Sequence, residues 1–208
     1  MSDLIFYTNP QSRGRIAHWM LEEIGVPYET VWLDYGPAMK SGDYLAVNPM
    51  GKVPAIQHGG AVVTEAAAIC AYLADRFPEK NLLPPSSHPA RAAYFRWMFF
   101  AAGPLELAVT AKALGWEVPQ NKSGFVGFGS YSDTLNSLEK ALTPGPYICG
   151  EQFTAADVYV GSQIGWGMMV GTIEKRPLFE AYIGRLFARP AGQKANRINE
   201  DYLKSRKE

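Results

Sequence analysis

Apolar and polar positions at the start of the chain predict a strand, a helix and a second strand. Leu4 to Tyr7 is a short apolar run that ends in a turn, as a buried strand does. From Ser12 to Ile24 apolar residues keep helical spacing, Ser12 suits the N-cap position, and Gly25 ends the helix. Tyr28 to Leu33 then alternates like a strand. This is the βαβ pattern, whose crossover connection implies parallel pairing.

The following segment predicts a short helix, a hairpin and a longer helix. The short helix is expected around residues 37–47, and the turn His58-Gly59-Gly60 separates two strands before the Ala-rich run that starts at Ala66. Pro54 cannot donate a backbone hydrogen bond, so it marks either a sheet edge or a cis turn. A helix start can bind an anion, although an ordinary capped hairpin is the alternative reading. The order up to Phe77 is βαβαββα, which is thioredoxin-like.

A proline-rich stretch separates this region from one without strand-like alternation. We therefore predict a thioredoxin-like α/β domain over residues 1–78, a linker over 79–89 and an all-helical domain over 90–208. Clusters of Gly and Pro divide the helical domain into at least four helices, the last of which is short. Thr154 and Asp157 have the spacing of a helix-capping pair, which predicts a structural role at the start of a core helix.

Composition limits the possible functions. The chain has 208 residues, a formal net charge of zero and 47% hydrophobic residues, which predicts a soluble globular protein rather than an electrostatic binder of nucleic acid. Its apolar runs are too short to cross a membrane, and no signal peptide is recognised, so we expect a cytoplasmic location. Cys70 and Cys149 lie in no metal-binding or dithiol pattern, so no metal site is predicted.

Three motifs together resemble those of bacterial cytosolic glutathione S-transferases, and the resemblance covers essentially the whole chain. The motifs are Ser12-Arg13-Gly14-Arg15, the stretch from Asn48 to Ala55 with Thr64-Glu65, and the run from Gly150 to Asp157. The resemblance implies a homodimeric detoxification enzyme whose first domain binds glutathione as co-substrate. Its helical domain would supply the pocket for a small hydrophobic electrophile.

The resemblance also assigns residues to glutathione. Val53 and Pro54 take the positions of the residue that pairs with the tripeptide backbone and of the cis proline that follows it. Glu65 and the backbone amide of Ala66 would bind the γ-glutamyl end, and Lys40 and Lys52 are candidates for the glycyl carboxylate. The family usually has Ser where this chain has Ala66, and a lost hydrogen bond to a charged group costs about 1.5 to 3 kcal/mol.

The expected chemistry is attack by the glutathione thiolate on an electrophile. A free thiol has a pKa of about 8.5, so the protein must lower that pKa by about two units, or about 2.7 kcal/mol. The dipole of the first helix and a hydroxyl donor near the sulfur together suffice. Ser12 is the first candidate for that donor, and Asn9 and Thr8 are rivals. An N-cap accepts with its oxygen, so the hydroxyl proton of Ser12 is expected to be available to sulfur.

Two tryptophans, Trp97 and Trp166, are hypothetical residues of the electrophile pocket, although aromatic residues at helical spacing mostly pack in cores. Two other functions stay open at this point. The same site could run glutathione-dependent reduction of disulfides or peroxides, which Asn9 and Thr8 near the sulfur would favour. The chain could also be a non-catalytic binding module, because Ala66 lacks the usual hydroxyl.

Overall fold

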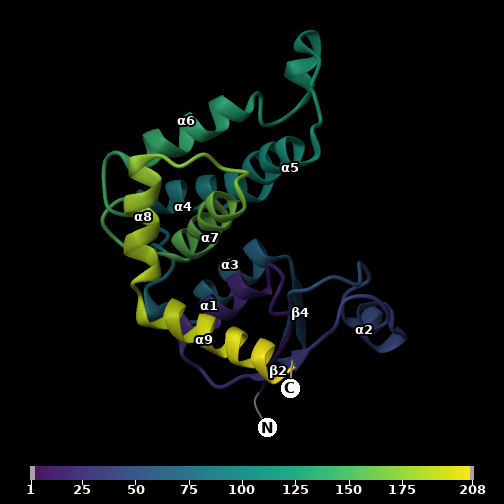
Figure 1. Ribbon diagram of the computed structural model, residues 1–208. Coiled ribbons are helices and arrows are strands. Elements are labelled where there is room, and N and C mark those ends of the chain that lie inside the picture. Colours follow the sequence, from purple (N-terminus) through teal and green to yellow (C-terminus); the bar gives the residue numbers. More distant parts are fainter. Residues whose placement is uncertain (1–2, 207–208) are drawn as a thin grey trace. The chain divides into compact units, whose positions relative to one another are not determined.

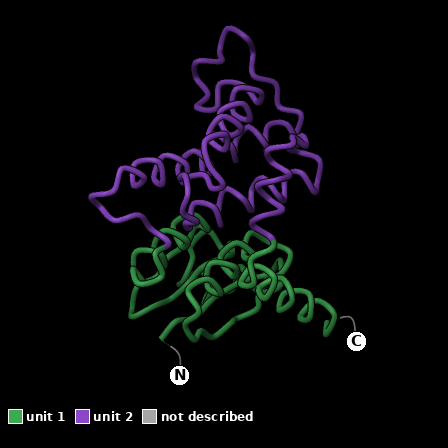
Figure 2. Tube along the Cα trace, turned by 90° about the vertical axis from the view of Figure 1, so that its left-hand side faces the viewer, with its two compact units in different colours: residues 1–81, 188–208 green, residues 82–187 purple. Residues whose placement is uncertain are grey.

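The structure is a computed structural model that describes residues 3–206. The chain divides into two compact units (Figure 2). The first unit takes in the described residues up to 81 together with those from 188 onwards, and the second comprises residues 82–187. The first contains a mixed sheet with helices and the second is helical, so the predicted combination of a thioredoxin-like region and an all-helical region is confirmed.

The first unit is built on a four-stranded sheet. Its strands are β1 (Leu4–Thr8), β2 (Glu29–Trp32), β3 (Ala55–His58) and β4 (Ala61–Thr64), in the order β2-β1-β3-β4. β1 pairs with β2 in parallel, as the βαβ pattern predicted, and the other two pairings are antiparallel. Every second residue of β1 is buried, because successive side chains of a strand point to opposite faces.

Helices accompany this sheet in the first unit (Figure 1). The longer ones are α1 (Gly14–Ile24), α3 (Ala66–Arg76) and α9 (Pro190–Ser205), and the short ones are η1 (Pro37–Lys40), α2 (Gly42–Val47) and η2 (Pro78–Lys80). α1 packs against both α3 and α9. The fully buried core of the unit includes Phe6, Met20, Leu21, Ile56 and Leu73.

The position of α9 differs from the sequence prediction, which assigned all of residues 90–208 to the helical domain and expected a short last helix. α9 has 16 residues and belongs to the first unit. The physical reason is its buried face, where Ala195 and Asn199 lie against α1 and the side chain of Asn199 meets that of His18. Helical periodicity alone does not reveal which layer a helix covers.

The predicted linker at 79–89 also differs in the structure. Leu82 is buried, and its carbonyl accepts a hydrogen bond from the amide of Ala155 at 2.8 Å. The carbonyl of Pro84 accepts from the guanidinium of Arg91 at 2.8 Å. Residues from 82 onwards are therefore built into the second unit, and the two units meet in the chain at Asn81 and Leu82.

The second unit is helical, apart from an isolated bridge between Tyr147 and Gly150. Its elements are α4 (Ala90–Phe100), the π-helical turn η3 (Ala101–Leu105), α5 (Glu106–Leu114), η4 (Gln120–Phe125), α6 (Tyr131–Leu142), α7 (Ala155–Val170) and α8 (Pro177–Phe187). The π-helical turn contains Pro104, which cannot donate the usual backbone hydrogen bond.

A buried carboxylate fixes the start of α7, as the sequence predicted. Thr154 and Asp157 form a capping box. Asp157 is fully buried and also accepts hydrogen bonds from the amide of Ile148 and the hydroxyl of Tyr182, both at 2.8 Å. Burial raises the pKa of Asp157 to about 6, against the effect of these hydrogen bonds. One side chain thus joins the start of α7 to α8 and to the preceding loop.

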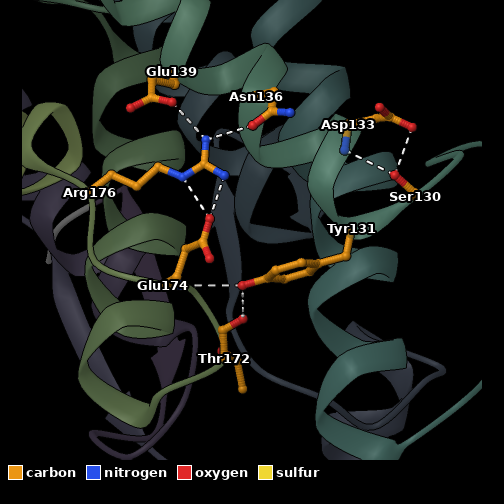
Figure 3. Close-up of polar contacts among 8 residues, drawn as sticks. All are labelled: Ser130, Tyr131, Asp133, Asn136, Glu139, Thr172, Glu174 and Arg176. Carbon is orange, nitrogen blue, oxygen red and sulfur yellow. Dashed lines mark hydrogen bonds and ion pairs between the residues drawn. The ribbon is translucent and has the colours of Figure 1, made fainter.

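A polar cluster joins α6 to the connection between α7 and α8 (Figure 3). The guanidinium of Arg176 contacts Glu139 at 2.8 Å, Asn136 at 2.9 Å and Glu174. Nearby, the hydroxyl of Tyr131 donates to the carbonyl of Thr172 at 2.9 Å. These polar contacts, together with the buried side chain of Ile173, hold the connection in place. Across the described residues, no helix is both long and apolar enough to span a membrane.

Candidate functional site

The strand register brings the predicted site residues to one edge of the sheet. Tyr7 lies opposite Ala55, and Ala55 lies opposite Thr64. The carboxyl ends of β1 and β4 and the amino end of β3 therefore meet at the same edge. The loop of residues 8–12 leaves from there, residues 53–54 arrive there, and residues 65–66 follow from it. We call these three segments together the strand-end edge.

The loop of the strand-end edge is fixed by its own polar groups. The side-chain amide of Asn9 donates to the carbonyl of Leu33 at 2.8 Å, and its oxygen accepts from the amide of Gln11 at 2.9 Å. The carbonyl of Thr8 accepts from the amide of Leu33 at 2.8 Å. Asn9 is only 6% exposed. Its side chain therefore acts as a structural tie between the loop and the chain that leaves β2.

The position of Ser12 and the direction of its hydroxyl differ from the prediction. α1 begins at Gly14, and the residue at its N-cap position is Arg13, whose side chain makes no capping bond. Ser12 still serves the helix start, because its Oγ accepts from the amide of Gly14 at 2.9 Å. The hydroxyl proton, which was expected to be available, is donated to the carbonyl of Asn9 at 2.7 Å. A loop of only two residues between Asn9 and Ser12 brings these groups together.

Thr8 lies at the end of β1 with its side chain turned inward. It is completely buried, and its hydroxyl has no hydrogen-bond partner among the described residues. A Cβ atom placed on Gly14 would lie 2.0 Å from that hydroxyl oxygen, so only glycine lets α1 approach the strand this closely. Of the three predicted thiol-contacting residues, Ser12 alone is partly exposed.

The segment before β3 contains a cis proline and a carbonyl held by two side chains. The Val53–Pro54 peptide bond is cis, as one of the two alternatives for Pro54 required. The carbonyl of Lys52 accepts hydrogen bonds from the Tyr44 hydroxyl at 2.6 Å and from the Asn48 side-chain amide at 2.7 Å. Burial raises the pKa of Tyr44 to about 12, so the phenol stays a donor at neutral pH. This role of Tyr44 was not predicted from the sequence, because no local motif shows which group its hydroxyl meets.

The start of α3 is the third segment of the strand-end edge. Glu65 is exposed and has a φ of 67°, a left-handed conformation that costs a non-glycine residue about 1 to 3 kcal/mol. The side chain of Glu65, at the N-cap position of α3, makes no capping hydrogen bond. The amides of the first turn, beginning with that of Ala66, therefore retain their capacity to bind an acceptor. Strain at such a position is typical of functional sites.

The two predicted lysines have different surroundings. The ammonium of Lys40 donates to the carbonyl of Met50 at 2.8 Å and lies against Gly51, where an added Cβ would be 2.8 Å from Nζ. Lys52 is exposed, and its ammonium makes no hydrogen bond or ion pair with any other described residue. Lys40 thus supports the loop before β3, whereas the role of Lys52 in binding stays a prediction.

The two tryptophans suggested for a pocket both lie in the second unit. Trp97 is 5% exposed and packs edge-on against Phe100, with the guanidinium of Arg96 over its ring. Trp166 on α7 is 55% exposed. Trp97 is thus a core residue of its unit, and only Trp166 presents an open ring. In residues 3–206 no group of three or more His, Cys, Asp or Glu side chains is arranged to hold a metal ion.

Comparisons with known proteins identify the family of the chain. A sequence model of the N-terminal domain of glutathione S-transferases matches residues 13–76. The chain is 31% identical to glutathione S-transferase GstA of Escherichia coli O157:H7 over 195 residues, which cover 92% of this chain and 96% of the relative.

Solved structures extend the likeness to the whole chain. The crystal structure of a glutathione transferase from Methylococcus capsulatus is 30% identical and matches with a TM-score of 0.77, covering 95% of this chain and 98% of the other. A glutathione transferase homologue from Sulfitobacter, solved with bound glutathione, is 25% identical, with a TM-score of 0.76 and coverage of 95% and 98%. The chain belongs to the glutathione S-transferase family of enzymes.

Proposed function

We propose that the strand-end edge binds glutathione and lowers the pKa of its thiol, so that the thiolate attacks a carbon of a small hydrophobic electrophile. The observation that carries this proposal is the register of β1, β3 and β4, which gathers a hydroxyl, a presented backbone and two helix starts at one edge. In the reaction the thiol loses its proton, a carbon–sulfur bond forms, and the leaving group departs with the electron pair of the broken bond.

Each segment of the edge has a proposed part in binding. The backbone of Val53 pairs with the tripeptide, and the double hydrogen bond on the Lys52 carbonyl holds that backbone in place. Glu65 binds the γ-glutamyl amine, and the amide of Ala66 binds the neighbouring carboxylate. Lys52 is the first partner for the glycyl carboxylate, because Lys40 is already hydrogen-bonded to Met50.

Ser12 is the proposed donor to the sulfur. To act, its hydroxyl must turn from the carbonyl of Asn9 to the thiolate, which a serine rotor can do. That carbonyl keeps a hydrogen bond from the amide of Ser12 at 3.1 Å, so the turn leaves no carbonyl unpaired. Its oxygen still accepts from Gly14, so the helix start is undisturbed. Asn9 and Thr8 are weaker candidates, since one is tied to Leu33 and the other is buried.

An ultraviolet difference titration of bound glutathione against pH tests the proposal. In the wild type we expect the thiol to titrate about two pKa units below its free value of about 8.5, and in Ser12→Ala only about one unit below it. Ser137→Ala is the matched control, because its hydroxyl also donates to a backbone carbonyl at 2.7 Å, but in the second unit. A wild-type thiol that titrates near its free value contradicts the proposal.

Further assays separate the proposed reaction from its alternatives. Conjugation of a chlorinated nitrobenzene should exceed the reduction of a mixed disulfide, because Asn9 is hydrogen-bonded to Leu33 and Gln11 and Thr8 is buried. No retention of glutathione at millimolar concentration would instead favour a binding module. We also propose, from the family resemblance, a homodimer in the cytoplasm, which light scattering and cell fractionation test.

A further inference from the structure

Arg15 contacts both the site loop and α9. The guanidinium of Arg15, in the first turn of α1, donates through Nε to the carbonyl of Pro10 at 2.5 Å. Its Nη2 atom lies 2.6 Å from a carboxylate oxygen of Glu200, and its Nη1 atom lies 3.5 Å from the amide oxygen of Asn196. Pro10 sits in the loop between Asn9 and Ser12. Arg15 therefore joins α9 to that loop.

We propose that Glu200 is a positioning residue of the glutathione site, which acts through Arg15 on the loop of residues 9–12. The carboxylate limits the orientations of the guanidinium, and the guanidinium in turn holds the carbonyl of Pro10. This inference rests on the proposed function for its effect on the thiol. It concerns a residue 185 positions away in sequence from Arg15, in a helix that the family model at residues 13–76 does not include.

The direction of the Ser12 hydroxyl depends on the loop that Arg15 holds. Both the hydroxyl and the amide of Ser12 donate to the carbonyl of Asn9, which directly precedes Pro10. A loop that moves at Pro10 moves that carbonyl and the serine together. Small displacements of a group that must meet a reacting atom reduce rates more than they reduce stability. The contact can thus matter for the reaction although Arg15 and Glu200 are partly exposed.

The rest of the α1–α9 contact separates this effect from a general loss of packing. Farther along α1, Glu22 pairs with Lys194 at 2.7 Å and Glu23 with Arg189 at 2.7 Å. These pairs, together with the buried contact of Asn199, attach α9 without Glu200. Removing the Glu200 carboxylate should therefore leave the helix docked while the guanidinium of Arg15 loses this acceptor.

Three substitutions and a matched control test the inference. Glu200→Ala removes the acceptor, Glu200→Gln keeps an oxygen for the guanidinium, and Arg15→Ala removes the link. Asp201→Ala is the control, since this neighbouring carboxylate on α9 pairs with Lys204 of the same helix, at 3.5 Å. In Glu200→Ala we expect kcat/KM to fall about threefold to fivefold, mostly in kcat, with a higher pKa of the bound thiol. Glu200→Gln should recover most of the loss.

A double variant and hydrogen exchange decide the outcome. If Glu200 acts through Arg15, the double variant Arg15→Ala/Glu200→Ala is no slower than Arg15→Ala alone. In the ligand-free protein, amide exchange at residues 11–14 should be faster in Glu200→Ala than in the wild type and Asp201→Ala. Exchange unchanged by Glu200→Ala, or additive losses in the double variant, would overturn the inference. A wild-type thiol with an unshifted pKa would instead overturn the proposed function and leave the exchange result intact.

Discussion

The side-chain nitrogen of Asn199 lies 2.9 Å from Nδ1 of His18, and both residues are completely buried. The same nitrogen donates to the carbonyl of Ala195 at 2.7 Å, so it has one hydrogen for each partner. Nδ1 of His18 is therefore the acceptor, and Nε2 carries the hydrogen and donates to the Tyr28 hydroxyl at 2.8 Å. That hydroxyl donates to Glu22 at 2.5 Å. The imidazole is neutral in the folded protein.

This neutral histidine predicts a loss of stability in acid. Burial lowers the pKa of His18 below its usual 6.5. Below pH 6.5 the unfolded chain then binds a proton that the folded chain does not, so the free energy of unfolding decreases as the pH falls through that value. Urea unfolding at pH 7.5, 6.5 and 5.5 measures the slope. His18→Gln should reduce it, and an unchanged slope in this variant would show that other groups cause it.

The buried carboxylate of Asp157 predicts a large effect of one substitution. Asp157→Ala leaves the amides of Ile148 and Thr154 and the hydroxyl of Tyr182 without their acceptor, and each unsatisfied buried donor costs about 1 to 3 kcal/mol. We expect a loss of at least about 3 kcal/mol in the free energy of unfolding. Asp133→Ala is the matched control, because it removes an exposed carboxylate from the third residue of α6. Denaturant unfolding should rank the two variants clearly.

A substitution in the polar cluster around Arg176 should lower the free energy of unfolding by less than Asp157→Ala does. Arg176→Met keeps most of the aliphatic stem but loses the contacts with Glu139, Asn136 and Glu174, while the buried apolar core is untouched. We expect a decrease of about 1 to 2 kcal/mol in the free energy of unfolding. This difference from the wild type should become smaller at high salt, because salt weakens the ion pairs of the wild type. Arg206→Met removes an exposed pair with Asp34 and should leave the unfolding midpoint unchanged. Equal effects of the two substitutions would contradict this ranking.

Replacing Ala66 by serine should increase the affinity for glutathione. Ala66→Ser restores a hydroxyl at the first residue of α3, where the γ-glutamyl carboxylate is proposed to bind. A hydrogen bond to a charged group is worth about 1.5 to 3 kcal/mol, so the dissociation constant of glutathione should fall about tenfold or more. Calorimetry measures it, and Ala68→Ser, an exposed position on the same helix, is the control. No gain in Ala66→Ser would place the carboxylate elsewhere.

Substitutions of Lys52 and Lys40 should affect different properties, namely glutathione affinity and protein stability. Lys52→Ala should raise the dissociation constant of glutathione about twofold to fivefold, because an exposed ion pair is lost, and the effect should shrink with added salt. Lys40→Ala removes the hydrogen bond to Met50 and should lower the unfolding midpoint instead. Lys140→Ala, an exposed lysine of the second unit, serves as the control. A stronger effect of Lys40→Ala on affinity would reverse the assignment of the two lysines.

Local patterns predicted the elements of the first unit well, because strand alternation, helical spacing and Gly25 at the end of α1 are properties of short segments. The capping box of Thr154 and Asp157 could also be predicted from the sequence, since it depends on two residues three positions apart. Two errors came from long-range packing. Neither the docking of α9 on α1 nor the burial of Leu82 in the helical unit leaves a mark in local periodicity.

The same distinction applies to the site. The positions of Val53, Pro54 and Glu65 follow from their places next to strands, and the structure brings them to one edge. The direction of the Ser12 hydroxyl depends on a rotamer and on a neighbouring carbonyl, which residue types do not specify. Likewise, Tyr44 and Asn48 meet on the Lys52 carbonyl only after the chain has turned back on itself.

The location of α9 has a consequence for how the protein is made on the ribosome. The unit that begins the chain cannot cover Trp19 and His18 until residues 188 onwards have left the exit tunnel, although domains usually fold in order of synthesis. The second unit, residues 82–187, is complete earlier. We expect protease to cut the first unit and spare the second in stalled chains that expose residues only up to 187. Protection of both units in such chains would show that the sheet folds without its last helix.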